Sequence, residues 1–260
     1  MTGYTRPDTI RPYRNHALAL LLGCLGALGC APSHAADTPN DPWERLNRAT
    51  YAFNSAFDRM LGRPVAKAYV AVLPEAGRHA ISNFVANLAY PTAIVNDALQ
   101  GKIAIAGSDT ARFVVNSSIG LAGFFDPATH FGLASHHQDF GQTLGTWGVP
   151  AGPYLMLPIL GPSDLRDAPA ELVDRYLTVD HYFDKSTERY GVTALRVVDR
   201  RAELLSTDAT IDTAFDSYAL IRASYLARRN YLVHDGQVTD VTYDDPPPDD
   251  NTDTKTDTPK

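Results

Sequence analysis

The chain has 260 residues, of which 44% are hydrophobic and 20% charged, so it is long enough to bury a core in one large or two small domains. Thirty acidic residues against 23 basic ones give a net charge of −7, which argues against a nucleic-acid partner because phosphate binding depends on clustered Lys and Arg. The two cysteines lie within the first 30 residues, where they make neither a disulfide framework nor a zinc site.

The N-terminus has the pattern of a secretory signal. Arg6, Arg11 and Arg14 precede an uncharged apolar run over 17–29. A basic segment followed by a short apolar one is typical of a signal peptide, and 13 residues are too few to cross a bilayer. Residues 1–29 are therefore predicted to be a signal peptide, and the chain to be exported.

The end of this signal resembles a bacterial lipobox, in which a cysteine is lipidated and becomes the mature N-terminus. Cys30 leaves the full apolar segment before it, whereas Cys24 leaves only a short one. We take Cys30 as the lipidated residue, with Cys24 and soluble export after Ala35 as the alternatives. Buried acyl chains contribute about 0.8 kcal/mol per CH₂, so a multiply acylated cysteine would hold the protein firmly on a membrane.

Composition divides the remainder of the chain. Residues 30–41 form a short polar tether after the lipidated cysteine. Residues 236–260 carry seven Asp against two Lys and a run of three prolines, a composition that cannot bury enough apolar surface to fold. We predict a disordered acidic tail there and a single folded domain over 42–235.

Apolar periodicity within that domain is helical. Apolar residues recur every three or four positions from Leu46 to Met60, after a plausible cap at 40–42, and again up to Pro91, from Ile94 to a stop at Gly101, and from Ile103 onward to Gly120. Two longer helices are predicted over about 187–206 and 214–233. Strand-like alternation is almost absent, so the expected fold class is mainly α.

The exception is the segment 140–167, where glycines and prolines are too dense for a long helix or a central strand. Its apolar run over 154–160 fits two readings equally well. It is either a buried loop packed under the helices, or an apolar surface that lines a lipid path or touches the bilayer.

Motifs of catalysis are not found. His130, His136, His137 and Asp139 lack the spacing of a helical zinc site, and the histidines are expected to be exposed in loops. Ser163 is not in a nucleophile elbow and is expected to cap the following helix. The sequence predicts no enzyme, no metal site and no cofactor.

The chain resembles the MlaA (VacJ) lipoproteins of Gram-negative bacteria over roughly residues 41–230. The opening Asp41-Pro-Trp-Glu-Arg-Leu-Asn-Arg-Ala-Thr-Tyr-Ala-Phe-Asn54 looks like the family's first motif. The more specific match is Phe140-Gly-Gln-Thr-Leu-Gly-Thr-Trp-Gly148, continuing through Gly152-Pro-Tyr154 to Leu165-Arg-Asp167. The order of these motifs behind a lipobox makes the resemblance strong.

This resemblance implies a ring-like helical lipoprotein on the periplasmic side of the outer membrane. Such proteins work with trimeric porins and remove phospholipid mislocalised to the outer leaflet through an amphipathic channel. They pass the lipid to a soluble periplasmic carrier, and an inner-membrane ABC transporter lies further along. The resemblance also implies no catalytic, nucleotide or metal site.

Two sets of residues are candidates for that role. The first is a lipid-path or membrane-contact surface, and the second a set of glycines whose conformational freedom gates the opening. The contact candidates are Tyr154, Leu155, Met156, Leu157, Ile159, Leu160, Phe124 and Phe125, and the gating candidates are Gly141, Gly145, Gly148 and Gly152.

Two alternatives belong to other functional classes. The first is a structural or interaction lipoprotein of the envelope that moves no lipid. The second is a lipid hydrolase using Ser163 with one of the histidines, which phospholipid turnover abolished by Ser163→Ala would be needed to support.

Overall fold

The computed structural model describes residues 41–237. The predicted signal peptide, Cys24, Cys30, most of the tether and nearly all of the acidic tail lie outside them. The described part is mainly helical, as predicted, with one short β-hairpin. Its elements are α2 (Glu44–Phe57), the π-helical turn η1 (Asp58–Gly62), α3 (Arg63–Val72), α4 (Glu75–Leu99), α5 (Ile103–Ser118), α6 (Pro127–His130), α7 (Phe140–Thr146), β1 (Tyr154–Leu157), β2 (Gly161–Asp164), α8 (Asp167–Leu177), the 3₁₀ turn η2 (Val179–Tyr182), α9 (Ser186–Glu203), the 3₁₀ turn η3 (Leu204–Thr207), α10 (Asp208–Thr213) and α11 (Ser217–Val233).

Two local expectations at helix ends and breaks were wrong. No side chain caps α2, whose N-cap position is Trp43. Helix α4 does not stop at Pro91 but runs through it. Proline removes one backbone hydrogen bond, yet residues on both sides of Pro91, such as Leu88 and Ala93, are buried against neighbouring helices. Packing therefore overrides the proline, while the predicted stop at Gly101, with φ +78°, is confirmed.

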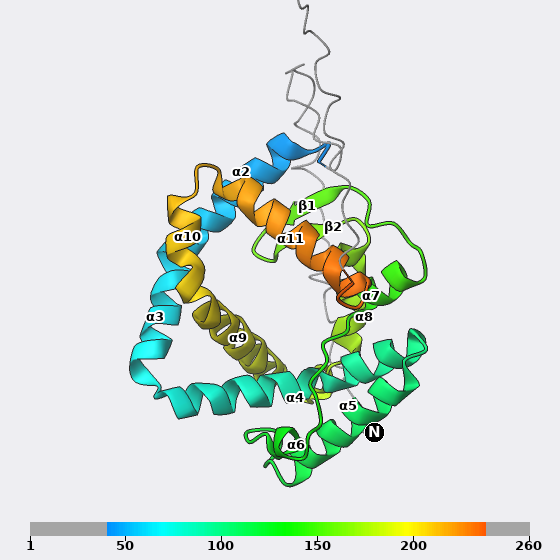
Figure 1. The fold of residues 1–260 in the computed structure, drawn as a ribbon. Coiled ribbons are helices and arrows are strands. Elements are labelled where there is room, and N and C mark those ends of the chain that lie inside the picture. The colour runs from blue at the N-terminus through cyan, green and yellow to red at the C-terminus, as the bar shows by residue number, and fades with distance from the viewer. Residues whose placement is uncertain (1–40, 238–260) are drawn as a thin grey trace, which may run out of the picture. The chain divides into compact units, whose positions relative to one another are not determined.

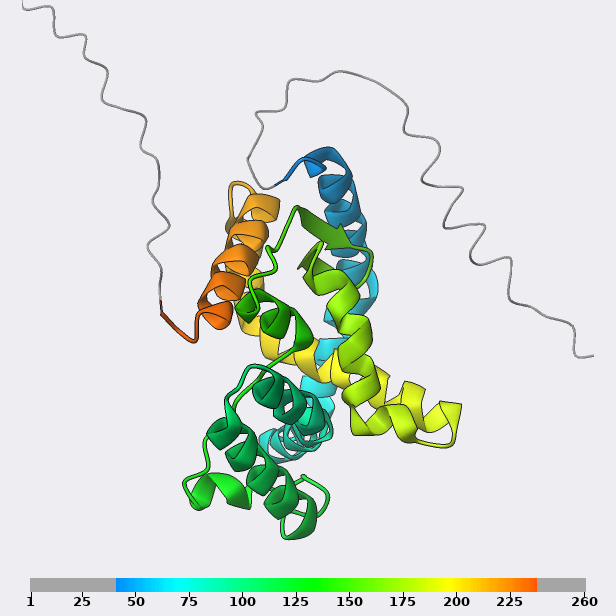
Figure 2. The ribbon, with the colours of Figure 1, turned by 90° about the vertical axis from the view of Figure 1, so that its right-hand side faces the viewer.

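Contacts between the elements form a closed circuit (Figure 1). Helix α2 continues through η1 into α3, α3 packs on α9, α9 on α4, and α4 on α7. Helix α7 then packs on α11, α11 on β2, and β1 returns to α2. Turning the view shows the hairpin lying between α2 and α11 (Figure 2). Within residues 41–237, no helix is both long and apolar enough to cross a membrane.

Side-chain amides of α2 hold the outer edge of the hairpin. Strands β1 and β2 pair antiparallel, with Tyr154 opposite Asp164, which leaves the other edge of β1 unpaired. Asn47 donates to the carbonyl of Tyr154 at 3.0 Å and accepts from the amide of Met156 at 2.9 Å. Asn54, two turns later, donates to the carbonyl of Leu157 and accepts from the amide of Ile159. Helix α2 thus takes the place of a third strand.

Asp41 connects α2 to α11. Its carboxylate is buried and accepts from Asn47 at 2.7 Å, from the hydroxyl of Tyr218 and from Arg222 at 3.2 Å. Asp41 therefore links the start of α2 to the first half of α11, which explains why it does not serve as a helix cap.

Arg229 makes the equivalent connection at the other end of α11. It forms a two-pronged ion pair with Asp139, at 2.6 and 3.0 Å, and a third contact with Asp167 at 2.5 Å. Asp139 also caps α7 by accepting from the amide of Gln142. Guanidinium–carboxylate pairs of this geometry are among the stronger polar contacts in proteins, so α7, α8 and α11 are joined at one point.

Buried positions are unusually polar. Among the described residues, eleven buried side chains are apolar and seventeen are polar or charged. The apolar cluster is small and consists of Tyr154, Met156 and Tyr218, with Tyr51, Ile221, Tyr225 and Leu226 packed around it. Each buried polar group must be hydrogen-bonded to avoid a large desolvation cost. The circuit therefore depends on specific polar contacts as much as on apolar burial.

Gly141→Ala tests the contact at Arg229. An added Cβ at position 141 would lie 2.4 Å from Oδ1 of Asp167 and 2.7 Å from Nη2 of Arg229, so the ion-pair cluster must move. We expect a loss of about 1–3 kcal/mol in the free energy of unfolding. Gly107→Ala, on α5 with open space around it, is the matched control and should be neutral or stabilising. Equal stability of the two variants in denaturant unfolding would contradict this account.

Candidate functional site

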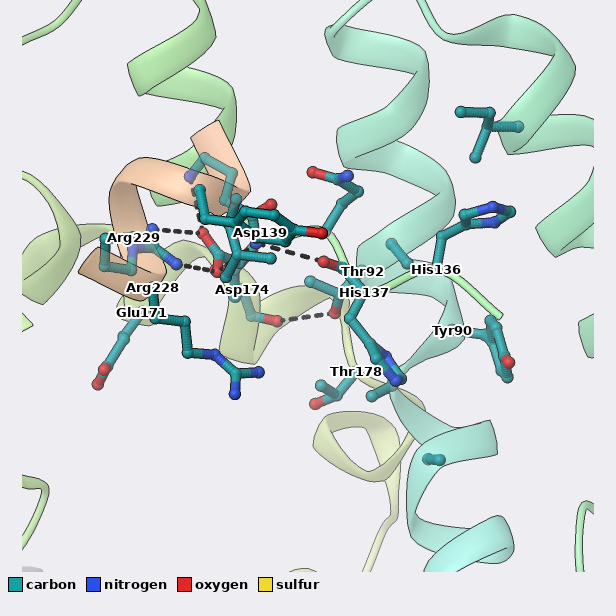
Figure 3. Close-up of a pocket in the computed structure, with 18 of the residues that line it drawn as sticks. Tyr90, Thr92, His136, His137, Asp139, Glu171, Asp174, Thr178, Arg228 and Arg229 are labelled. Carbon is teal, nitrogen blue, oxygen red and sulfur yellow. Dashed lines mark hydrogen bonds and ion pairs between the residues drawn. The ribbon is translucent and has the colours of Figure 1, made fainter. Parts of the chain in front are cut away.

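A large cavity of about 1240 Å³ lies between α4, α8, α9 and α11 (Figure 3). One wall is a face of α4 made of Ala86, Ala89, Tyr90, Thr92 and Ala93. The three alanines are small and apolar and recur at helical spacing, so they make this side of the cavity mainly apolar.

The opposite wall is charged. Most of its side chains come from α8, α9 and α11, with Lys102, Asp139 and Asp235 from adjoining loops, and most are neutralised nearby. Arg229 pairs with Asp139, Lys102 with Asp235, Arg196 with Asp180 and Arg200 with Glu203. Three further ionic side chains of this wall are Glu171, Arg175 and Arg228. The cavity is therefore amphipathic, with apolar and charged surfaces facing each other.

His136 and His137 line this cavity, which the sequence did not predict, although His137 is exposed as expected. His130 is exposed as expected. His136 is half-buried and its Nδ1 lies 3.0 Å from Oδ1 of Asp109, while His137 lines the cavity beside it. Partial removal from water lowers the pKa of His137; the charge of Asp109 opposes this shift, and those of Arg228 and Arg200 add to it. A neutral imidazole is therefore favoured there.

Two buried carboxylates lie next to His136. Asp97 on α4 and Asp109 on α5 are both fully buried, and neither Asp97 oxygen has a described hydrogen-bond donor. Burial, followed by the neighbouring Asp109, raises the pKa of Asp97 to about 6. Burial likewise raises the pKa of Asp174, on α8, to about 6. Within residues 41–237, no group of three or more His, Cys, Asp or Glu side chains is placed to hold a metal ion.

The predicted contact segment 154–160 is divided by its strand geometry. Tyr154 and Met156 are 0% and 5% exposed and form the centre of the apolar core. Their inclusion in a lipid-contact surface is corrected by this burial, because alternate residues of a strand point to opposite faces. Leu155 and Leu157 are half-buried. Ser163 does not cap α8, whose N-cap position is Arg166; the carboxylate of Asp164 instead accepts from the amides of Arg166 and Asp167 just before the helix.

The remaining contact candidates are exposed at two turns. Ile159 and Leu160 occupy the tip of the hairpin, where Ile159 is 64% exposed. Phe124 and Phe125 follow α5, and Phe124 stacks on Phe84 with ring centroids 4.7 Å apart. Neither pair lines the cavity. The predicted surface is thus two separate apolar turns, and the cavity is a third site.

The four candidate glycines differ in their surroundings. Gly141 and Gly145 lie inside α7, where an added Cβ would collide with Asp167 and Arg229 or with Arg166 and Val233. Glycine is required at these two positions because neighbouring side chains pack closely against α7, and not because of an unusual backbone angle. Gly148 and Gly152 have φ of +88° and +71° in the loop between α7 and β1, a region that favours glycine.

Sequence reasoning missed the charged wall itself. Glu171, Arg175 and Arg228 have no motif around them, and exposed charges on helices normally carry no signal. The helical spacing of Glu171 and Arg175, four residues apart, places them on one face of α8. That spacing alone does not reveal that the face lines a cavity.

Comparison with known proteins adds independent information. Residues 39–232 match the family described as MlaA lipoprotein. A relative in Escherichia coli (strain K12), named "Intermembrane phospholipid transport system lipoprotein MlaA", is 33% identical over 228 residues, which is 85% of this chain and 89% of the relative. The protein of the same name in Haemophilus influenzae is 30% identical, covering 86% of this chain and 92% of the relative.

An experimental structure agrees with this sequence match. It belongs to work described as "Structural basis for maintenance of bacterial outer membrane lipid asymmetry". The superposition has a TM-score of 0.68 at 32% identity and covers 74% of this chain and 98% of the other.

Asp97→Asn tests the buried carboxylate pair. Because the pKa of Asp97 in the folded state lies above its ordinary value of 3.8, the folded protein binds more protons than the unfolded one between about pH 4 and 6. Stability from this group is therefore lost as pH rises through that window, by up to about 3 kcal/mol. We expect Asp97→Asn to raise the thermal midpoint at pH 8 and to have little effect at pH 4. Asp184→Asn, an exposed control, should change neither.

Proposed function

The chain belongs to the MlaA lipoprotein family, and from that premise we propose that it is the outer-membrane lipoprotein of a phospholipid transport system. It removes phospholipid mislocalised to the outer leaflet through an amphipathic channel, and so maintains the lipid asymmetry of the outer membrane. The observation that carries this proposal is the cavity, in which the apolar face of α4 stands opposite the charged wall of α8, α9 and α11.

A phospholipid that leaves a bilayer needs two kinds of surface at once. Its acyl chains lose free energy in water and its head group loses free energy in an apolar medium. The face of Ala86, Ala89 and Ala93 suits the chains, and the charged wall suits the head group. We infer that the closed circuit of helices is ring-like and surrounds this route. Gly148 and Gly152 remain the candidates for a hinge beside it.

In this proposal the two exposed apolar turns contact the membrane. We assign lipid contact to Phe124, Phe125, Ile159 and Leu160, with Leu155 and Leu157 at the margin. Apolar side chains on a protein surface bind the boundary between head groups and acyl chains. Lipidation at Cys30 would add an anchor on the periplasmic side, outside the described residues.

The proposed partners follow from the route. A trimeric porin would position the protein in the outer membrane, and a soluble periplasmic carrier would accept the lipid. The protein itself carries out no catalysis in this account and needs no cofactor. Ser163, the candidate for a hydrolase, is 2% exposed and its hydroxyl has no hydrogen-bond partner among the described residues.

Surface phospholipid tests the proposed function. Outer-leaflet phospholipid is measured in a strain lacking the gene, complemented with wild type, Cys30→Ala or Cys24→Ala. We expect the deletion to raise surface phospholipid, and complementation with Cys24→Ala to bring it back to the wild-type level. Cys30→Ala should lower it only partly, because the anchor is lost. Unchanged surface lipid in the deletion strain, with the wild-type protein in the outer membrane, would instead support an interaction protein without transport.

Two aspartate substitutions, tested separately, distinguish residues that contact the membrane from residues of the core. Met156→Asp buries a charge in the apolar cluster, so we expect little folded protein. Ile159→Asp places the charge on an exposed turn and should leave the thermal midpoint within a few degrees of wild type. It should reduce lipid removal, because the turn would then seat less well in the leaflet. Wild-type transport by a folded Ile159→Asp variant would refute lipid contact at the hairpin tip.

A further inference from the structure

A second cavity, of about 450 Å³, lies between α2, α10, α11 and the hairpin. Apolar side chains reach it from several elements, among them Met156 of β1 and Ile221 of α11. One side is formed by residues 204–216, which comprise η3, α10 and the turn before α11, and which we call the α10 segment. This segment follows α9 and lies beside α2 and α3 (Figure 1). Its residues that line the cavity are Leu204, Thr207, Asp208, Ile211, Asp212 and Ala214.

The α10 segment contributes no buried side chain. None of the residues 204–216 is buried, and the one aromatic residue among them, Phe215, is fully exposed. By contrast, the hairpin and α11 are fixed by Tyr154, Met156 and Tyr218, which are buried together. A segment with little buried apolar surface opens at a low cost in free energy. Apolar packing therefore closes this side of the second cavity only weakly.

Both ends of the segment are attached to neighbouring helices. The carboxylate of Asp208 lies between Arg201 of α9, at 2.8 Å, and Arg63 of α3, at 3.1 Å, and its side chain is 15% exposed. Asp216 caps α11 and pairs with Arg48 of α2 at 2.7 Å. A carboxylate with two such partners is held more firmly than one with a single exposed partner. These two aspartates are therefore fixed points, and the rest of α10 lies between them.

Asp212, one turn after Asp208, holds the middle of the segment. Its carboxylate accepts two hydrogen bonds from Arg63, at 2.9 and 3.1 Å, and its side chain is 50% exposed. The hydrogen bond from Arg63 lowers the pKa of Asp212, and the charges of Arg63 and Arg59 add to this shift, so the carboxylate is ionised. An exposed ion pair contributes little to stability and is screened by salt. This contact can break while Asp208 still holds Arg63.

We propose that the α10 segment is a lid over the second cavity, latched by Asp212 and Arg63, whose opening gives a phospholipid access to the circuit of helices from its side. The inference rests on the proposed transport function and adds a moving part to it. The lid turns about its attachments at Asp208 and Asp216. Its opening uncovers the apolar lining at Met156 and Ile221, which suits acyl chains because they avoid water.

Distances between two nitroxide labels test the movement. The labels are attached through Thr210→Cys on α10 and Lys67→Cys on α3, both exposed positions, in the full-length lipidated protein held in amphipol. A pulsed dipolar measurement should show a short and a long distance population. We expect the long population to rise about threefold in Asp212→Asn, or in about 1 M NaCl, because either change weakens the latch. Glu188→Gln removes a comparably exposed carboxylate from a 3.0 Å ion pair at the start of α9, and should change neither population.

A reversible cross-link tests what the lid does. In Arg63→Cys/Asp212→Cys, at two positions whose wild-type side chains are in contact, a cleavable bismaleimide joins α3 to α10. Surface phospholipid is measured in the deletion strain complemented with this variant. We expect linking to raise it toward the level of the deletion strain, and cleavage of the linker to lower it again. Linking Lys185→Cys/Glu188→Cys, at the start of α9, is the matched control and should leave it unchanged.

The outcomes separate the lid from the transport function. A single distance population that neither salt nor Asp212→Asn changes would refute the lid. Unchanged surface phospholipid at complete linking would refute its role in lipid access. A deletion strain with normal surface phospholipid would refute the transport function instead, and the label distances would still decide whether the segment moves. Thermal midpoints within a few degrees of wild type establish that the variants are folded.

Discussion

The arrangement of the whole domain depends on two asparagine side chains of α2. Asn47 and Asn54 each donate to a carbonyl and accept from an amide of β1, and so satisfy an edge that a two-stranded hairpin would leave open. A hairpin of two four-residue strands is marginal by itself. With β1 held between α2 and β2, the hairpin positions Tyr154 and Met156 as the apolar core on which α11 packs. Without this contact the circuit of helices would be open at one point.

Polar contacts of this kind recur around the circuit. Asp41 joins α2 to α11, Arg229 joins α11 to α7 and α8, and Arg201 joins α9 to Asp58 of the π-helical turn through two hydrogen bonds. Polar contacts are geometrically exacting and lose much of their value when one partner moves. A domain with a small apolar core can thereby keep a defined shape around a large amphipathic cavity. Apolar residues that are not used in a core are left for the surface, including the turns at Phe125 and Ile159.

The sequence predicted the helices well where apolar periodicity was undisturbed, as in α5, α9 and α11. It failed at Pro91, because the burial of neighbouring α4 residues outweighs one missing hydrogen bond. It did not reveal the hairpin, since β1 is completed by asparagines about a hundred residues earlier in the chain. The two asparagines lie seven positions apart, which places them on one face of α2, but their partner is not visible in that spacing. The charged wall of the cavity was missed because Arg228 and Glu171 look like any exposed helix residues until the walls are assembled.

A reversible block of the cavity tests the central claim most directly. Ala89 lies on the apolar face of α4, and the chain's two cysteines, Cys24 and Cys30, are respectively removed and lipidated in the proposed mature protein. A cysteine introduced as Ala89→Cys would therefore be the single reactive thiol. Outer-leaflet phospholipid is measured before labelling with a bulky methanethiosulfonate, after it, and after reduction. A lipid route through the cavity predicts a rise on labelling and a return on reduction. Unchanged surface phospholipid at complete labelling would contradict it.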